Sequence, residues 1–439
     1  MKIQFYIFSI MVFLIGLLIE NEIIINIAAI VLCINVCYSN YQRKGAESID
    51  VIFMFLIASG LTALGNTIAI LSQGEANESV YFLYMVPEHI LKASTIHYVG
   101  TLFILVGYNL IPNKNILPKI NKFQIKPRYT SGILILGIII IYIIISGRLP
   151  QLGTVSSYIK LFPILIIFFL ARYGASIGST KIKNFAFILL IIESLRALFF
   201  EYLRTNIILP LVAYFFGLLI GYKNFKYILS NRFYVIYVAA FFAFSYFTTF
   251  GALRSTYVTG VERISLLATE EESRENTFWS RLSNLNQLTN IVDLESSNGY
   301  YDGATLNYFA FALIPRFLWP EKPKIAKGRW FAIEIGQAYE KDDGQVNNSI
   351  NMTVPGEFHL NYGWPGLVVG CILFGILISM IWNTCDFWSA DYNIFRSVFG
   401  FYLLFLGLFS LGADLQVVIT IIAIYLLTLL VSKLFITIA

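Results

Sequence analysis

Apolar runs long enough to cross a lipid bilayer recur along most of this chain. Each helix in a bilayer requires about 20 apolar residues, and helices satisfy their own backbone hydrogen bonds there. With 57% hydrophobic and 13% charged residues, the chain is expected to be an all-α polytopic membrane protein. The runs predict about twelve spans, several of them short. These spans cover residues 5–19, 23–38, 51–71, 90–110, 131–145, 158–171, 185–200, 206–222, 233–250, 364–382, 394–411 and 415–434.

The distribution of positive charge predicts how these spans are oriented. Lys and Arg gather in alternate short loops, at residues 43–44, 114–128, 172–183 and 223–232. Such loops face the cytoplasm, which places both termini in the cytoplasm. The chain then divides into nine helices in residues 1–250, a large extracytoplasmic loop in 251–362, and three more helices in 363–439.

The large loop is expected to carry function, because polar insertions of this length usually do. Within it, apolar side chains recur at helical spacing and predict an amphipathic helix that lies on the membrane or caps the bundle. They are Phe278, Leu282, Leu285, Leu288 and Val292. The later run TLNYFAFALIPRFLWP predicts a helix in the outer interface that stops at Pro315, with Arg316 at its foot.

Arginines near the outer ends of the spans are the most informative charged residues. Arg204, Arg254 and Arg316 belong to three different segments, and snorkelling to lipid headgroups is the simple explanation for the first two. Arg196 has Glu193 one turn earlier, which favours a local pair. A guanidinium binds phosphate oxygens bidentately. A converging arginine cluster would therefore suit a lipid-linked phosphate or diphosphate.

The lysines after Arg316 have two open interpretations. Lys322, Lys324 and Lys327, with Arg329, follow it directly. They would either strengthen the positive field at the site or be ordinary solvated loop charge.

Two candidate general bases lie in VPGEFHLNYGWPG, residues 354–366. Glu357 and His359 are placed there on a turn bounded by Gly and Pro, leading into the next helix. Either side chain can take a proton, and structural hydrogen bonding is the alternative role. Asp302 is a weaker third candidate, since the pair Asp302–Gly303 is first of all a turn signal.

Several classes of function lack support in the sequence. The net charge of +5 is small and not gathered on one face, which argues against nucleic acid as a partner. The four cysteines lie in or beside apolar spans and form no readable disulfide or metal framework. No GxGxxG or Walker loop is present, so we expect no metal and no nucleotide cofactor.

Two stretches together resemble a known family. The run GATLNYFAFALIPRFLWPEKPKI is followed about thirty residues later by NMTVPGEFHLNYGWPG, a spacing typical of a functional loop. This pattern, with the helix layout, resembles bacterial O-antigen and exopolysaccharide repeat-unit polymerases of the Wzy type. The family shares Ile-Pro-Arg, an aromatic-Pro pair, Lys-Pro, and Gly-Glu followed by Asn, an aromatic and Gly. His359 stands where an aromatic is common.

The resemblance implies a GT-C-like, metal-independent glycosyltransferase of the bacterial inner membrane, without a cofactor. Its donor and acceptor would be undecaprenyl-diphosphate-linked glycans at the periplasmic face, with a flippase and a chain-length regulator as partners in lipopolysaccharide O-antigen assembly. Arg204, Arg254 and Arg316 would bind diphosphate, and Glu357 or His359 would take the hydroxyl proton.

The role of the aromatic residues and the overall function each have alternatives. Trp319, Trp330, Tyr308 and Tyr362 would stack on sugars or form an interfacial belt. Two rival functions remain. An O-antigen ligase uses the same leaving group but transfers glycan to lipid A core. A lipid-linked oligosaccharide flippase or other transporter would instead place its charges at mid-membrane depth in repeated halves.

Overall fold

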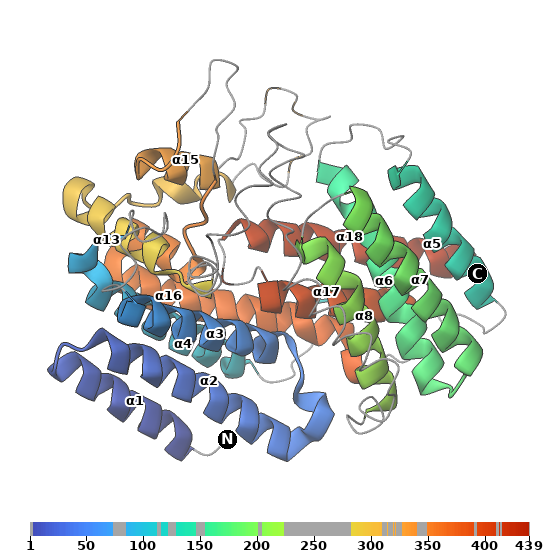
Figure 1. Ribbon diagram of the computed structural model, residues 1–439, viewed down its shortest axis with the longest axis horizontal. Helices are drawn as coiled ribbons and strands as arrows, with labels where there is room; N and C mark the ends of the chain where they lie inside the picture. Colours follow the sequence, from blue (N-terminus) through green and yellow to red (C-terminus); the bar gives the residue numbers. More distant parts are fainter. Residues whose placement is uncertain are drawn as a thin grey trace, which may run out of the picture. The chain divides into compact units, whose positions relative to one another are not determined.

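The described part of the chain is helical. The computed structural model describes residues 3–72, 85–111, 116–121, 129–145, 154–200, 204–223, 282–309, 314, 319, 321, 327–339, 349–389, 393–409, 412 and 415–438, and its regular elements are all helices (Figure 1). Within these residues, five helices are long and apolar enough to cross a membrane: Glu22–Ser48, Val51–Leu71, Pro87–Leu110, Val354–Cys385 and Gln416–Lys433. The chain is thus a helical protein with several apolar spans, as expected.

Other expected spans are occupied by shorter apolar helices. These are Tyr6–Leu18, Thr130–Ile145, Leu161–Ser176, Leu209–Tyr222 and Ile394–Gly407. The expected span 233–250 lies outside the described residues, so the total of twelve stays a prediction.

Contacts divide the chain into two compact units. The first comprises Met1–Pro118, Glu270–Thr384 and Leu403–Leu427, and the second comprises Lys119–Thr269, Cys385–Tyr402 and Thr428–Ala439. Helices α17 (Ile394–Phe409) and α18 (Gln416–Ile438) therefore contribute to both units.

The first unit begins with helices that have well-defined starts. They are α1 (Ile3–Leu18), α2 (Glu22–Lys44), α3 (Val51–Leu71) and α4 (Ile90–Leu110). Asn21 caps α2 by accepting from Ile24 N at 3.1 Å, and Asp50 caps α3 by accepting from Phe53 N at 2.9 Å. Such caps satisfy amide groups that a helix start leaves without an acceptor. A short polar link is therefore enough to end one apolar helix and begin the next.

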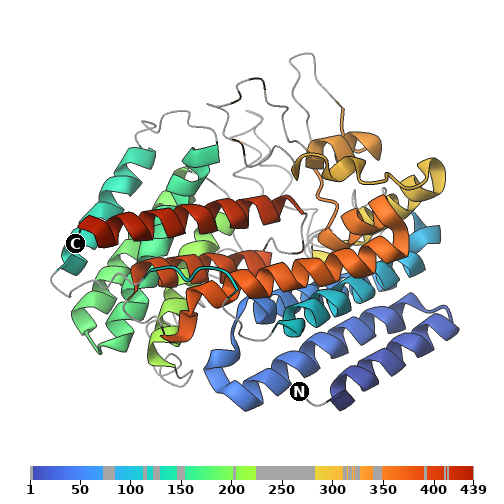
Figure 2. The same ribbon diagram turned by 180° about the vertical axis from the view of Figure 1, so that it is seen from behind.

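Helix α16 (Val354–Cys385) packs against α4 at very short range (Figure 2). A Cβ atom on Gly107 would collide with the carbonyl of Ile372, and one on Gly375 would collide with the carbonyl of Ile104. Small residues let helix backbones approach closely in membranes, where close packing drives association. The two glycines thus determine how α4 and α16 are aligned along each other, and so where the N-terminal turns of α16 lie.

The amphipathic segment of the large loop forms helix α13 (Leu285–Asn298), whose apolar face packs against the rest of its unit. Leu285, Leu288, Ile291 and Val292 are buried, and Ile291 and Leu288 lie against Gly356 of α16. The expected helix began near Phe278, which lies outside the described residues, and the observed helix continues six residues beyond the last predicted apolar position.

The second unit contains α5 (Thr130–Ile145), α6 (Thr154–Ser176), α7 (Thr180–Phe200) and α8 (Arg204–Tyr222). Aromatic packing fills its centre, with the rings of Phe168 and Phe401 stacked at 4.2 Å. Arg196 and Glu193 form a buried pair at 2.7 Å within α7. This confirms the local pairing predicted for Arg196.

Candidate functional site

The segment VPGEFHLN begins helix α16, so the turn predicted there is wrong. Thr353 Oγ1 accepts from Gly356 N at 3.1 Å, and Glu357 N donates to the carbonyl of Thr353 at 2.9 Å. Pro355 is tolerated because amides of the first helical turn have no intrahelical acceptor. Pro and Gly, read as turn residues in the sequence, therefore form the first turn of a capped helix.

A break in α16 follows at Tyr362 and Gly363. Gly363 adopts φ 62°, which favours glycine, and Pro365 lacks the amide that would bond the carbonyl of Asn361. The freed carbonyls of Leu360 and Asn361 instead accept from Tyr301 N and Asp302 N, each at 3.1 Å. The break thus creates the acceptors that dock the Tyr301–Asp302 turn.

Asp302 and Gly303 form this turn, as the Asp-Gly signal predicted. Asp302 has φ 46° and Gly303 has φ 85°. The Tyr362 hydroxyl lies where a Cβ of residue 303 would be, so glycine is required both by conformation and by space.

Four side chains and one backbone amide form the Glu357 cluster: Glu357, Lys327, Thr305, Asn361 and the N–H of Leu415. Glu357 is fully buried. Its Oε1 pairs with Lys327 Nζ and accepts from Thr305 Oγ1 at 3.1 Å, while Oε2 accepts from Leu415 N at 3.2 Å. Asn361 Nδ2 donates to Thr305 Oγ1 and to the carbonyl of Glu357, both at 2.7 Å.

The Glu357 cluster joins parts of the chain that are distant in sequence. Thr305 belongs to the short turn Ala304–Leu306, Lys327 begins α15 (Lys327–Glu334), and Leu415 precedes α18. The Lys327 ammonium also lies 3.9 Å from the ring centre of Tyr308. Buried charges require such partners, so solvated loop charge is the wrong interpretation for Lys327.

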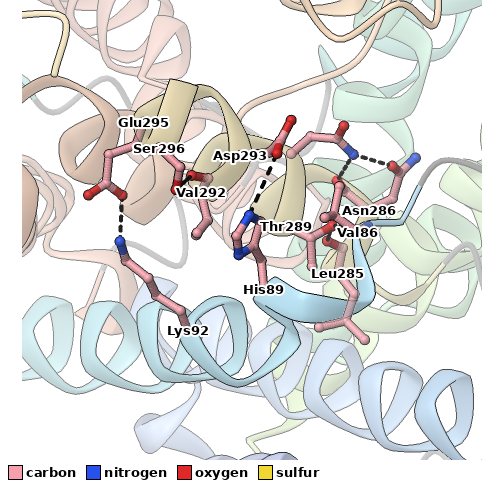
Figure 3. A network of polar contacts seen from close by, with 11 residues as sticks. Val86, His89, Lys92, Leu285, Asn286, Thr289, Val292, Asp293, Glu295 and Ser296 are labelled. Atoms are coloured by element: carbon pink, nitrogen blue, oxygen red, sulfur yellow. Dashed lines mark hydrogen bonds and ion pairs between the residues drawn. The ribbon is translucent and has the colours of Figure 1, made fainter. Parts of the chain in front are cut away.

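A second group, the Glu295 cluster, consists of Glu295, Lys92, Tyr300 and His359. Glu295 Oε2 accepts from Lys92 Nζ at 2.7 Å and lies 3.0 Å from His359 Nε2. Figure 3 shows Lys92 of α4 and Glu295 of α13 pointing toward one another, with the pair His89–Asp293 beside them. Tyr300 donates to Glu295 as well.

The electrostatics of the Glu295 cluster favour an ionised carboxylate. Burial alone raises the pKa of Glu295, but hydrogen bonds from Lys92 and Tyr300, with the charges of His359 and Lys92, lower it overall. The same hydrogen bond, together with burial and the carboxylate's charge, raises the pKa of Tyr300.

The predicted site residues are only partly within the described structure. Glu357 and His359 both lie in the first turns of α16, are wholly buried, and belong to different clusters. Arg316, Arg254, Lys322 and Lys324 lie outside the described residues. Arg204 begins α8, but its side chain lies outside them as well. Trp319 is 39% exposed. Convergence of the three arginines therefore stays a prediction.

Several residues of the two clusters were not singled out in the sequence. Thr305 and Asn361 lie inside the quoted runs without a distinguishing pattern. Lys92 carried a usable signal, because a charge within an apolar span requires a partner. Among the described residues, no three His, Cys, Asp or Glu side chains gather as a possible metal site.

Comparison with known proteins identifies no relative of this chain. No family model matches the chain, and neither a curated protein nor a solved structure matches it. The resemblance to repeat-unit polymerases therefore rests on the two sequence runs and their arrangement.

Proposed function

We propose that this chain is a membrane-embedded glycosyltransferase that polymerises undecaprenyl-diphosphate-linked oligosaccharide repeat units at the periplasmic face of the bacterial inner membrane. One observation carries the proposal. The runs GATLNY and VPGEFHLNYG, about fifty residues apart, are joined by buried hydrogen bonds from Thr305 to Glu357 and from Asn361 to Thr305. The described start of the first run is thus joined to the second run, which supports the proposal.

The proposed reaction joins two lipid-linked glycans. A hydroxyl of the incoming repeat unit attacks the anomeric carbon of the growing chain, a new C–O bond forms, and the bond to the lipid diphosphate breaks. The diphosphate leaves with the bonding electron pair, and a base takes the hydroxyl proton. Both substrates are held in one membrane, which provides proximity.

Arginine has a defined role in this proposal. Arg204, Arg254 and Arg316 would bind the diphosphate and stabilise the charge that develops on it, a term worth about 3 to 4 kcal/mol for each well-placed donor. Lys322 and Lys324 would add to that field, and Trp319, as an exposed aromatic, would stack on a sugar.

The general-base role of Glu357 or His359 stays a prediction. Both oxygens of Glu357 are bound by protein donors, and His359 contacts Glu295 while fully buried. These contacts suit residues that hold the two runs together. A catalytic base must reach the proton it removes, so a base role for either residue requires these contacts to rearrange when substrate binds.

Deletion in the host that encodes the chain, followed by electrophoresis of the surface glycan, tests the proposal. We expect the ladder of repeat units to disappear while a single unit remains attached. Loss of every attached unit would instead support an O-antigen ligase or a flippase.

Complementation with Arg316→Ala tests the proposed diphosphate site, and Arg329→Ala is its matched control. Arg329 lies in the same loop region, carries the same charge and is exposed. We expect Arg329→Ala to restore the ladder and Arg316→Ala to fail. An unchanged ladder with Arg316→Ala would remove that residue from the site.

A further inference from the structure

A line of polar side chains connects three helices of the first unit. Lys92 of α4 donates to Glu295 of α13 at 2.7 Å, and the same carboxylate oxygen lies 3.0 Å from His359 Nε2 of α16. The side chains of Glu295 and His359 are 11% and 0% exposed. Figure 3 shows that Lys92 and Glu295 reach toward each other across the space between α4 and α13.

Helix α13 is also held to its unit by contacts that do not involve Lys92, Glu295 or His359. Asn284, just before α13, donates to His97 Nδ1 at 3.2 Å and accepts from Asn66 Nδ2 at 3.0 Å. Thr289 accepts from Val86 N at 3.3 Å, and the apolar face of α13 is buried. Docking of helix α13 therefore does not require the Lys92–Glu295–His359 contact, in which the Lys92 side chain is 34% exposed and the other two are largely buried.

The neighbouring ion pair on α13 is different. Asp293 pairs with His89 at 3.6 Å, and the Asp293 side chain is 51% exposed. An exposed pair of this kind contributes little to stability. It touches neither His359 nor the break in α16, so it serves as an internal comparison for the buried contact.

Glu295 is linked to the break at Gly363 through two side chains. It binds His359, four residues before the break, and it accepts from Tyr300. The ring of Tyr300 lies against Gly363, where a Cβ would come within 2.7 Å of it. The rings of His359 and Trp364 also meet edge to face at 5.0 Å. A carboxylate bound to one imidazole nitrogen fixes the orientation and tautomer of the ring.

We propose that Glu295, itself held by Lys92, is a positioning residue that orients His359 and the broken segment of α16 for the glycosyl transfer. The inference rests on the proposed function, because positioning has a rate effect only if the chain is an enzyme. Glu295 and Lys92 act through His359 and need not touch the substrate.

The test measures the extension of an undecaprenyl-diphosphate-linked repeat unit by the purified full-length protein in lipid nanodiscs. We expect Glu295→Gln to lower kcat by about tenfold to a hundredfold while KM stays unchanged. Lys92→Met should act in the same direction, and Lys92→Arg should restore the rate because it keeps the donor. Asp293→Asn should leave both constants unchanged.

A double variant shows whether Glu295 acts through His359. We expect Glu295→Gln combined with His359→Asn to be no slower than His359→Asn alone, since the residue to be positioned is already missing. Independent, multiplicative losses would overturn the proposal. So would a Glu295→Gln enzyme as fast as Asp293→Asn.

Unfolding measurements separate this inference from the proposed function. If the wild-type protein extends no lipid-linked unit, the proposed function fails. The contact is then tested by the same two substitutions in a double-mutant cycle on unfolding. Non-additive losses would support a Glu295–His359 positioning contact, and additive losses would overturn it.

Discussion

Replacing Lys327 by Met tests the Glu357 cluster. The substitution removes the ammonium from a pair whose side chains are 10% and 0% exposed, and it leaves the Glu357 carboxylate buried. Met keeps most of the aliphatic side chain, so the change is mainly one of charge.

The expected loss in the free energy of unfolding depends on the partners that Glu357 keeps. Breaking a buried ion pair by removing one partner costs about 3 to 5 kcal/mol, because the other charge is left uncompensated. Glu357 still accepts from Thr305 Oγ1 and from Leu415 N. These donors partly compensate the carboxylate, so we expect the lower end of the range, about 3 kcal/mol.

A second substitution isolates the charge. Glu357→Gln added to Lys327→Met makes the buried group neutral and keeps an oxygen acceptor, so the residual loss should be about 1 kcal/mol, as for a weakened neutral hydrogen bond. The contact of Lys327 with the Tyr308 ring is lost in both variants. It therefore does not affect their difference.

Equilibrium unfolding in mixed micelles with an increasing fraction of SDS measures both free energies. The double variant should be more stable than Lys327→Met alone by about 2 kcal/mol. A single variant as stable as wild type would refute the buried ion pair. A double variant less stable than the single would refute the assignment of the loss to an uncompensated charge.

Three further outcomes follow from the same structure. Gly303→Ala should destabilise more than Gly336→Ala in unfolding. Both glycines have positive φ, but only residue 303 lies against Tyr362, whereas a Cβ on residue 336 would meet open space. Equal losses would contradict that contact. Leu288→Ala, at a fully buried position, should cost about 2 to 5 kcal/mol, and a loss near zero would show that α13 is not packed as described. Because the folded-state pKa of Glu295 is lowered, its contribution is present at neutral pH and lost as the pH falls through that value. Glu295→Gln should thus be less stable than wild type at neutral pH and approach it in acid, and a gap independent of pH would argue against an ionised Glu295.

Helices in the apolar part of the chain were predictable from the sequence. The expected spans 51–71 and 90–110 coincide with α3 and α4, since apolar length determines a membrane helix. The expected span 23–38 was too short, because α2 continues through polar residues to Lys44 and ends at Gly45 with φ 58°. The length of the apolar run indicates which part of a helix lies in lipid. The capping residues determine where the helix ends.

The site was less predictable because its contacts are non-local. Glu357 and His359 were identified as special by type and setting, but the start of α16 was interpreted as a turn before the helix because of Pro355 and Gly356. Only the fold reveals that Thr353 caps this helix. Lys327 was left between a contribution to the site and solvated loop charge, because nothing local in the sequence indicates a partner thirty residues away.

The central claim is most directly tested with purified protein and a single substrate, the undecaprenyl-diphosphate-linked repeat unit, in nanodiscs. The account predicts a series of lipid-linked products that differ in mass by one repeat unit and form without added nucleotide. Persistence of the monomeric unit alone would contradict it, as would transfer of glycan exclusively to added lipid A core.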